Sequence, residues 1–469
     1  MPYNFKDPNR NQAMLFPPSL KDMLPTDHFV WFLLEIAESF NLSKFYEFYR
    51  NDGTGGQAYE PRMMVCLLFY AYSKGVTSSR VIETNSYETL PYRAITGFSH
   101  IPDHSSISRF RQNHENALSE LFHQVIRLCI DKKQLDPKLV AVDGTKLKAN
   151  ASLSANHRYN QLYDDIKKYF EEANKVDAEE DKLYGEGGKP NFLPAEYKDP
   201  AKRKALVKEI ADSINRELNK EPQIEPESSP QEPQARVSTR KKRGRKPQRK
   251  SRPHRIVVNH TDPQSRVMKT RQGYIQGYNA QLVTTAEQYI VAADVVQDAN
   301  DVNQLNPMLE QAHNNLTQAG CTEKIGTVLA DAGYLSEANL RREYLSEIDL
   351  IIATGSRKQP KSERKTVKSN IFLDNHKRKM STAEAQVQYA KRSGIIESTI
   401  GQIKSCGREL RTFSRRGLQA CKNEFKLIAT THNLIKLWRS IVLRAKKLIK
   451  PTEKTENQLI WEKIDQLLA

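Results

Sequence analysis

The chain has 469 residues and lacks any long apolar run. Its longest, Met63 to Tyr72, is far shorter than the roughly 20 apolar residues that a membrane-spanning helix needs. The mean hydropathy is −0.69, and the first residues, Met1 to Asp7, contain no apolar core of a signal peptide. These absences exclude a transmembrane segment and favour a cytoplasmic location.

Cysteine is scarce and irregularly spaced. The five cysteines are Cys66, Cys129, Cys321, Cys406 and Cys421. Their number is odd and no two have the Cys-x-x-Cys spacing, which argues against a disulfide framework and a cysteine-ligated zinc site. We expect these thiols to act as small buried hydrophobic groups.

Acidic residues are outnumbered by basic ones. The chain has 73 Lys and Arg against 56 Asp and Glu, a formal net charge of +17. This excess indicates a polyanionic partner, either nucleic acid or an anionic membrane surface. The segment 240–255 holds ten Lys or Arg residues and no acid. We expect it, with Arg243, Arg245 and Lys246 near its centre, to bind DNA phosphates; the alternative is a solvated linker.

The N-terminal part of the chain, residues 1–135, has helical periodicity. Apolar residues recur at helical spacing, and one helix is expected to begin after Asp103. Near its start, Ser106, Arg109 and Gln112 lie three residues apart and would share one edge of the helix. The order of short helix, turn and short helix predicts a helix-turn-helix-like domain for DNA binding or dimerisation. Because many all-α domains share this pattern, a purely structural domain is the alternative.

The rest of the chain alternates strands and helices around a long polar interruption. A first apolar strand is expected within 136–150 and the remainder of the same α/β core within 263–445, as a mixed sheet with flanking helices. Residues 151–262 are too long and too polar for a core element, so we expect an insertion with charged helices and a disordered linker. Residues 446–469 are expected to form a helical tail.

Two aspartates, Asp143 and Asp331, each directly follow an apolar strand. Sites in α/β sheets form at the carboxyl ends of strands, and two adjacent carboxylates need a cation. Oxygen ligands favour Mg²⁺ or Mn²⁺, and a third carboxylate would complete a two-metal site for phosphodiester chemistry. The alternative is that each aspartate only caps a turn. Three further aspartates are candidates for extra metal ligands or, for the last of them, a helix N-cap: Asp294, Asp298 and Asp301.

Several segments carry a family resemblance. They are Val142-Asp143-Gly144-Thr145-Lys146, Gly277-Tyr278-Asn279-Ala280-Gln281, Leu329-Ala330-Asp331-Ala332-Gly333-Tyr334, and a basic helix with Tyr389, Arg392, Glu397 and Lys404. Together they resemble the catalytic core of DDE transposases of bacterial insertion sequences. Four residues separate Arg392 from Glu397, where the broad motif has three, and this spacing resembles the insertion-sequence family numbered eleven eighty-two.

The resemblance implies an RNase H-like fold and a DNA transposase that cleaves element ends and transfers the strands. Asp143, Asp331 and Glu397 would be the catalytic triad and the ligands of two Mg²⁺ ions, with Mn²⁺ able to substitute. The partner would be double-stranded DNA, as terminal inverted repeats and target, bound by a homodimer at the nucleoid without a membrane partner. An inactive transposase-derived DNA-binding protein and a metal-dependent nuclease without strand joining are the alternatives.

Helical geometry adds an expectation about the C-terminal motif. Tyr389 lies eight residues before Glu397 and Lys404 seven after it, so in an α-helix the three lie near one face and both flanking residues could contact DNA. Arg392 is five residues before Glu397, about 140° away around an ideal helix. We therefore expect Arg392 to point away from Glu397 unless the helix is irregular near Gly394. Arg392 would then contact DNA or form a structural salt bridge.

Overall fold

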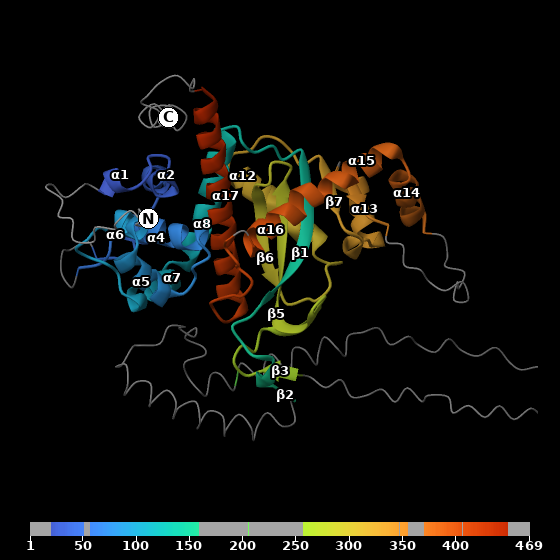
Figure 1. Cartoon of the computed structure of the whole chain (residues 1–469). Helices are drawn as coiled ribbons and strands as arrows, with labels where there is room; N and C mark the ends of the chain where they lie inside the picture. Colours follow the sequence, from blue (N-terminus) through green and yellow to red (C-terminus); the bar gives the residue numbers. More distant parts are fainter. Residues whose placement is uncertain are drawn as a thin grey trace, which may run out of the picture.

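The computed structural model describes residues 20–50, 57–158, 205, 257–346, 348–354, 370–405 and 407–448 (Figure 1). Almost all of the predicted insertion and tail lies outside these residues. The same holds for the basic segment 240–255 with Arg243, Arg245 and Lys246. None of the described helices is long and apolar enough to cross a membrane.

The N-terminal region is helical, as predicted. Its elements are α1 (Leu20–Met23), α2 (Phe29–Ile36), the 3-10 turn η1 (Ala37–Ser39), α3 (Ser43–Tyr46), α4 (Pro61–Ser73), α5 (Ser79–Glu88), α6 (Leu90–Thr96), α7 (His104–Asn113) and α8 (Glu115–Asp131). Helix α4 is buried over most of its length and forms the centre of this region. Helix α7 begins as expected after Asp103, whose carboxylate accepts the N–H of Ser106 at 2.9 Å.

Within the described residues, six strands form one mixed sheet. They are β1 (Leu139–Lys148), β4 (Arg266–Thr270), β5 (Gly273–Thr285), β6 (Ile290–Val296), β7 (Thr327–Ala330) and β8 (Asp349–Ile352). The order is β4-β5-β1-β7-β8, and β6 pairs with the same long strand β5 that pairs with β4. Strands β1, β7 and β8 are parallel, whereas β5 is antiparallel to β1, β4 and β6. A separate two-stranded sheet joins β2 (Asn156–Arg158) to β3 (Val257–Asn259).

Helices cover the sheet and connect it to the N-terminal region. They are α12 (Leu305–Gln318), α13 (Glu337–Ser346), α14 (Ile371–Met380), α15 (Ala383–Arg392), α16 (Ser398–Lys404) and α17 (Leu418–Leu448). Helix α17 packs against α4 and α8 on one side and against β6 on the other, so it runs between the two regions in Figure 1. One continuous hydrophobic core extends from Phe29 in α2 to Ala445 in α17.

The predicted mixed sheet and its first strand are present, but that strand is longer than its apolar run indicated. Strand β1 does not end at Asp143; it continues to Lys148 because its other edge stays paired with β5. Asp294, a candidate for an extra metal ligand, lies inside β6. The predicted N-cap at Asp301 is wrong: α12 begins four residues later, and Gln304 occupies the N-cap position.

Candidate active site

Asp143 and Asp331 lie at the same edge of the sheet. Strands β1 and β7 pair in parallel up to Val142 and Ala330, which are direct partners. Each aspartate is the next residue along the chain: Asp143 continues β1, and Asp331 directly follows the end of β7. The two predicted carboxylates are thus brought together by the register of one strand pair, although they lie far apart in the sequence.

The Asp143 carboxylate is almost enclosed. Its Oδ2 lies 2.6 Å from Nη2 of Arg392, and its Oδ1 accepts the N–H of Gly144 at 2.8 Å. Burial is the main cause that raises the pKa of Asp143 to about 6; Arg392 opposes the rise and the charge of Asp331 adds to it. The group therefore carries its negative charge at a free-energy cost that a nearby cation offsets.

Asp331 also makes a local contact. Its Oδ1 accepts the N–H of Gly333 at 2.8 Å, which caps the 3-10 turn η4 (Ala332–Tyr334). Asp331 therefore does cap a turn, which was the alternative to a role as metal ligand. The cap coexists with a position beside Asp143, because it holds the side chain at the end of β7.

Glu397 approaches Asp143 through one shared partner. Arg392 donates from Nη1 to Glu397 Oε1 at 3.1 Å, while its other terminal nitrogen binds Asp143. Ser393 Oγ donates to the second oxygen of Glu397 at 3.0 Å. The Arg392 side chain is 8% exposed and that of Glu397 is 55% exposed, so the glutamate lies at the solvent side of the cluster.

A π-helical turn brings Arg392 and Glu397 together. Residues Ser393–Glu397 form the π-helix η6, and the N–H of Ser398 donates to the carbonyl of Ser393, five residues earlier. The wider turn returns a residue at i+5 to the side of residue i, which an α-helix does not do. The sequence predicted that Arg392 and Glu397 could meet only if the helix were irregular near Gly394, and this π-turn is that irregularity. Arg392 forms the structural salt bridge that we considered for it.

The donor set of this cluster fits a divalent cation. Asp143, Asp331 and Glu397 offer carboxylate oxygens, the ligands that Mg²⁺ and Mn²⁺ prefer, and burial raises the pKa of Asp143 despite the neighbouring Arg392. Among the described residues, no three His, Cys, Asp or Glu side chains are close enough to hold a metal ion in this conformation. Arg392 instead provides the positive charge between Asp143 and Glu397.

The remaining two candidates of this motif, Lys404 and Tyr389, flank the cluster. Lys404 donates from Nζ to the carbonyl of Lys146 in β1 at 2.9 Å, and burial lowers its pKa. Tyr389 is half-buried, and burial raises its pKa. In this conformation Lys404 therefore ties α16 to the strand that carries Asp143.

The candidates Ser106, Arg109 and Gln112 lie elsewhere, on α7 of the helical region. Ser106 bonds to Asp103 through both its N–H and its hydroxyl. Arg109 is exposed, with Nη2 3.4 Å from Ser106 Oγ, and Gln112 is half-buried. The structure does not bring them to the carboxylate cluster.

The structure brings Asp301 together with Asn279 and Gln281 in a polar cluster behind Gly144, a contact that the sequence did not predict. Asp301 Oδ1 accepts from Asn279 at 2.7 Å and from Gln281 at 2.8 Å, and it lies 3.5 Å from Lys146 Nζ. A Cβ at Gly144 would lie 2.4 Å from Gln281 Nε2 and 2.7 Å from Asp301 Oδ1. The available signal was the Asn279-x-Gln281 spacing, which puts both amides on one face of β5.

The other two aspartates near this strand also have partners. Asp294 pairs with Lys422 of α17 at 3.0 Å, and Asp298 Oδ2 accepts from Gln304 at 2.9 Å. The first contact links β6 to α17, and the second lies in the segment that connects β6 to α12. In this conformation both carboxylates make structural contacts.

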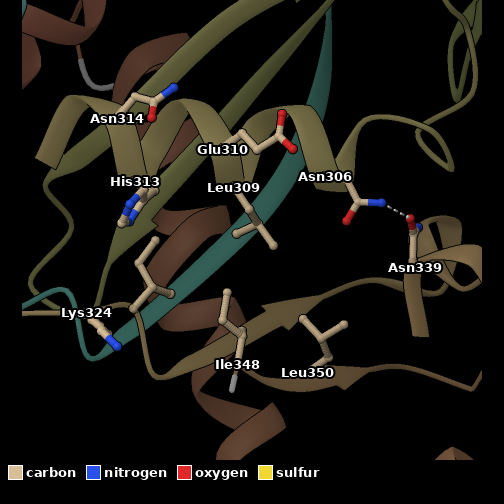
Figure 2. A pocket seen from close by; sticks show the side chains of 10 residues that line it. Asn306, Leu309, Glu310, His313, Asn314, Lys324, Asn339, Ile348 and Leu350 are labelled. Carbon is tan, nitrogen blue, oxygen red and sulfur yellow. Dashed lines mark hydrogen bonds between the residues drawn. The ribbon is translucent and has the colours of Figure 1, made fainter. Parts of the chain in front are cut away.

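A cavity of about 360 Å³ lies away from the carboxylates, between α12 and β8 (Figure 2). Leu309 and His313 of α12 face Ile348 and Leu350 across it. None of Asp143, Asp331 and Glu397 lines it. The chemistry of the carboxylates is therefore separate from this hollow.

Two family models match parts of this chain. Residues 18–113 match the family model of a transposase domain (DUF772), and residues 238–434 match that of the transposase DDE domain. The second span includes Asp331 and Glu397, whereas Asp143 lies in neither span. No curated protein and no solved structure matches the chain.

The DDE match has consequences for both fold and chemistry. It implies an RNase H-like fold for the mixed sheet, and an enzyme that acts on DNA by metal-dependent cleavage and strand transfer. The helical N-terminal region has its own match to a transposase domain. With both spans in one chain, this protein belongs to the DDE transposases of insertion sequences.

Proposed function

We propose that Asp143, Asp331 and Glu397 are the residues with which this transposase binds two Mg²⁺ ions, cleaves the ends of its element and joins them to target DNA. One observation carries the assignment: Asp143 and Asp331 follow the paired residues Val142 and Ala330, and Arg392 bridges Asp143 to Glu397. The ends of two neighbouring strands and one shared arginine therefore support a common site for three acidic groups that are separated in sequence.

The chain's own groups have distinct tasks in this proposal. A pair of bound metal ions supplies activation of the attacking oxygen and stabilisation of the leaving oxygen. The three carboxylates hold that charge in place, and the Arg392 bridge keeps two of them aimed at a common point beforehand. Since Asp143 is enclosed and Glu397 is exposed, the DNA backbone would approach from the side of Glu397.

DNA binding is proposed to use surfaces separate from the carboxylates. On α7, exposed Arg109 with Ser106 and Gln112 would contact element ends, and the basic segment 240–255 would bind phosphates without sequence preference. A homodimer at the nucleoid in the cytoplasm would hold both ends. The four residues between Arg392 and Glu397 support the finer assignment to the insertion-sequence family numbered eleven eighty-two.

The test uses a plasmid that carries the coding sequence with its native flanking DNA, together with a second plasmid as target. With Mg²⁺ or Mn²⁺ the wild-type protein should cut the first and join it to the second. Asp143→Asn, Asp331→Asn and Glu397→Gln keep side-chain shape but remove the charge that holds the cation, so each should abolish both reactions. Binding of the flanking DNA should survive.

Glu384→Gln is the matched control, because Glu384 is an exposed acid in the first turn of α15. It should cleave normally. A Glu397→Gln protein that cuts at the wild-type rate would refute the assignment. Cutting without joining by the wild type would leave a metal-dependent nuclease.

A further inference from the structure

Gln288 occupies an unusual backbone position in the turn between β5 and β6. Its φ is +68°, in the left-handed region. The turn is closed by the N–H of Gln288 donating to Thr285 O at 2.8 Å and by the N–H of Thr285 donating to Tyr289 O at 2.9 Å. Such a loop favours glycine at its left-handed residue, because a Cβ is strained there. Residue 288 therefore carries a long side chain at a backbone position that favours glycine.

That side chain reaches three other elements. Its Nε2 donates to the carbonyl of Gly394 at 2.7 Å and lies 3.3 Å from Ser398 Oγ. Its Oε1 accepts from Gln402 of α16 at 2.9 Å and from Lys436 of α17 at 3.1 Å. One amide thus links the β5–β6 turn to the π-turn and to two helices.

The backbone of the same residue is tied down as well. His432 of α17, which is completely buried, bonds from Nε2 to the carbonyl of Gln288 at 2.9 Å. The turn cannot drift away from α17 without breaking that contact. Gln288 is therefore a fixed donor that faces the π-turn rather than a loose surface residue.

The acceptor of this donor lies inside η6. Gly394 is the second of the five π-helical residues, and the π register is rarer and less favourable than the α register. A side-chain donor on the Gly394 carbonyl stabilises the wider turn. The π-turn in turn sets the approach of Arg392 to Glu397.

We propose that Gln288 is a positioning residue of the transposase: by donating to the Gly394 carbonyl it holds the π-turn that aims Glu397 at the catalytic edge. Gln288 touches none of the three carboxylates and acts through Gly394. The proposal rests on the proposed function, since Glu397 must be a working ligand for its aim to matter.

The decisive variant is Gln288→Glu. Glutamate has the same length and still accepts from Gln402 and Lys436, but its carboxylate cannot donate to the Gly394 carbonyl. Gln288→Gly is the second variant, because it removes the side chain and the left-handed strain together. Glu287→Gln is the control: Glu287 is an exposed neighbour in the same turn, and its carboxylate accepts from the N–H of Asp136, not from the π-turn.

Four quantities are measured for each protein. They are the cleavage rate at saturating flanking DNA, the Kd for that DNA, the affinity for Mn²⁺ without DNA by electron paramagnetic resonance, and the unfolding temperature. For Gln288→Glu we expect the rate to fall roughly 10- to 100-fold, as for a small misplacement of a reacting group, and Mn²⁺ affinity to fall roughly 10-fold, as for loss of a supporting contact at a metal site. The DNA Kd and the unfolding temperature should stay close to wild type.

The two variants together separate positioning from plain stability. Gln288→Gly should also show a lower cleavage rate and a lower Mn²⁺ affinity. Its unfolding temperature should not fall in parallel, because the substitution relieves the backbone strain. Wild-type rates and Mn²⁺ affinity in both variants would overturn the proposal, as would losses that merely follow the unfolding temperature. Failure of the wild-type protein itself to bind Mn²⁺ or to cleave would instead refute the proposed function.

Discussion

Arg392 and Glu397 lie five residues apart in sequence, and their side chains meet, with Nη1 3.1 Å from Oε1. The same guanidinium binds Asp143, which is 249 residues away in sequence. The π-turn between the two charged groups absorbs the extra residue that distinguishes this spacing from an i, i+4 pair. A change of one residue in helix register therefore decides whether two carboxylates share a partner.

Deletion of Gly394 should convert the π-turn into ordinary α-helix without separating Arg392 from Glu397. The two residues would become an i, i+4 pair on one face, and Gly394 is exposed with no atoms near its missing Cβ. We expect a folded protein whose rate no longer responds to Gln288→Glu, measured as a double-mutant cycle. Additive losses in the two changes would contradict this coupling.

Arg392→Gln should increase the affinity of the DNA-free protein for Mn²⁺. Arg392 compensates Asp143 and Glu397, so its removal leaves negative charge that a cation can neutralise. Without metal the variant should lose roughly 3–5 kcal/mol of stability, the usual cost of breaking a buried ion pair. Thermal unfolding with and without Mn²⁺ measures both effects.

The control for this variant is Lys391→Gln, since Lys391 is the preceding residue of α15 and is exposed. It should change neither quantity much. Equal Mn²⁺ stabilisation of wild type and Arg392→Gln would show that Arg392 and the cation do not compete.

His432 should make the protein sensitive to acid. Burial, aided by the charge of Arg408, lowers the pKa of His432 to about 3. In the unfolded chain the imidazole takes up a proton near pH 6.5, but the folded state resists protonation. Stability present above about pH 6.5 is therefore lost as pH falls toward 3, by roughly 1.4 kcal/mol per pH unit from this group. His432→Gln should flatten the fall between pH 6 and pH 4 in urea unfolding curves; identical slopes would rule this out.

Gly75 should be intolerant of any side chain. Its φ is +73°, and a Cβ there would lie 1.8 Å from the carbonyl oxygen of Arg408, in the loop between α16 and α17. Gly75→Ala should cost more than about 4 kcal/mol, because left-handed strain and a backbone clash add. Gly320, with φ +81° and no atom within 4 Å, isolates the strain, so Gly320→Ala should cost about 1–2 kcal/mol. Equal losses in denaturant unfolding would contradict the clash.

Several features follow from short stretches of sequence. Val140 to Val142 and Val328 to Ala330 are fully buried strands, as their apolar composition indicated, and the aspartates after them lie at one edge as expected. The start of α7 after Asp103 also follows from a local rule, since an aspartate bonds to the N–H groups of the first helical turn.

Other features needed long-range contacts. The apolar run of β1 ends before Asp143, but its hydrogen bonds to β5 continue to Lys148, and no composition signal marks that continuation. Asp301 precedes a helix and resembles a cap in sequence, yet two amides of β5 and a lysine of β1 compete for its carboxylate.

The division has a physical cause. Apolar periodicity, capping and strand-end carboxylates act over a few residues, so the order of elements and the aspartates Asp143 and Asp331 could be predicted from the chain itself. Glu397 was named only through the family resemblance of its motif. The register of η6, the strained backbone of Gln288 and the Arg392 bridge depend on partners more than a hundred residues away. Such contacts form only when the tertiary structure has packed. The free energy that they contribute outweighs the local preference for α-helix at Gly394 and for glycine at residue 288.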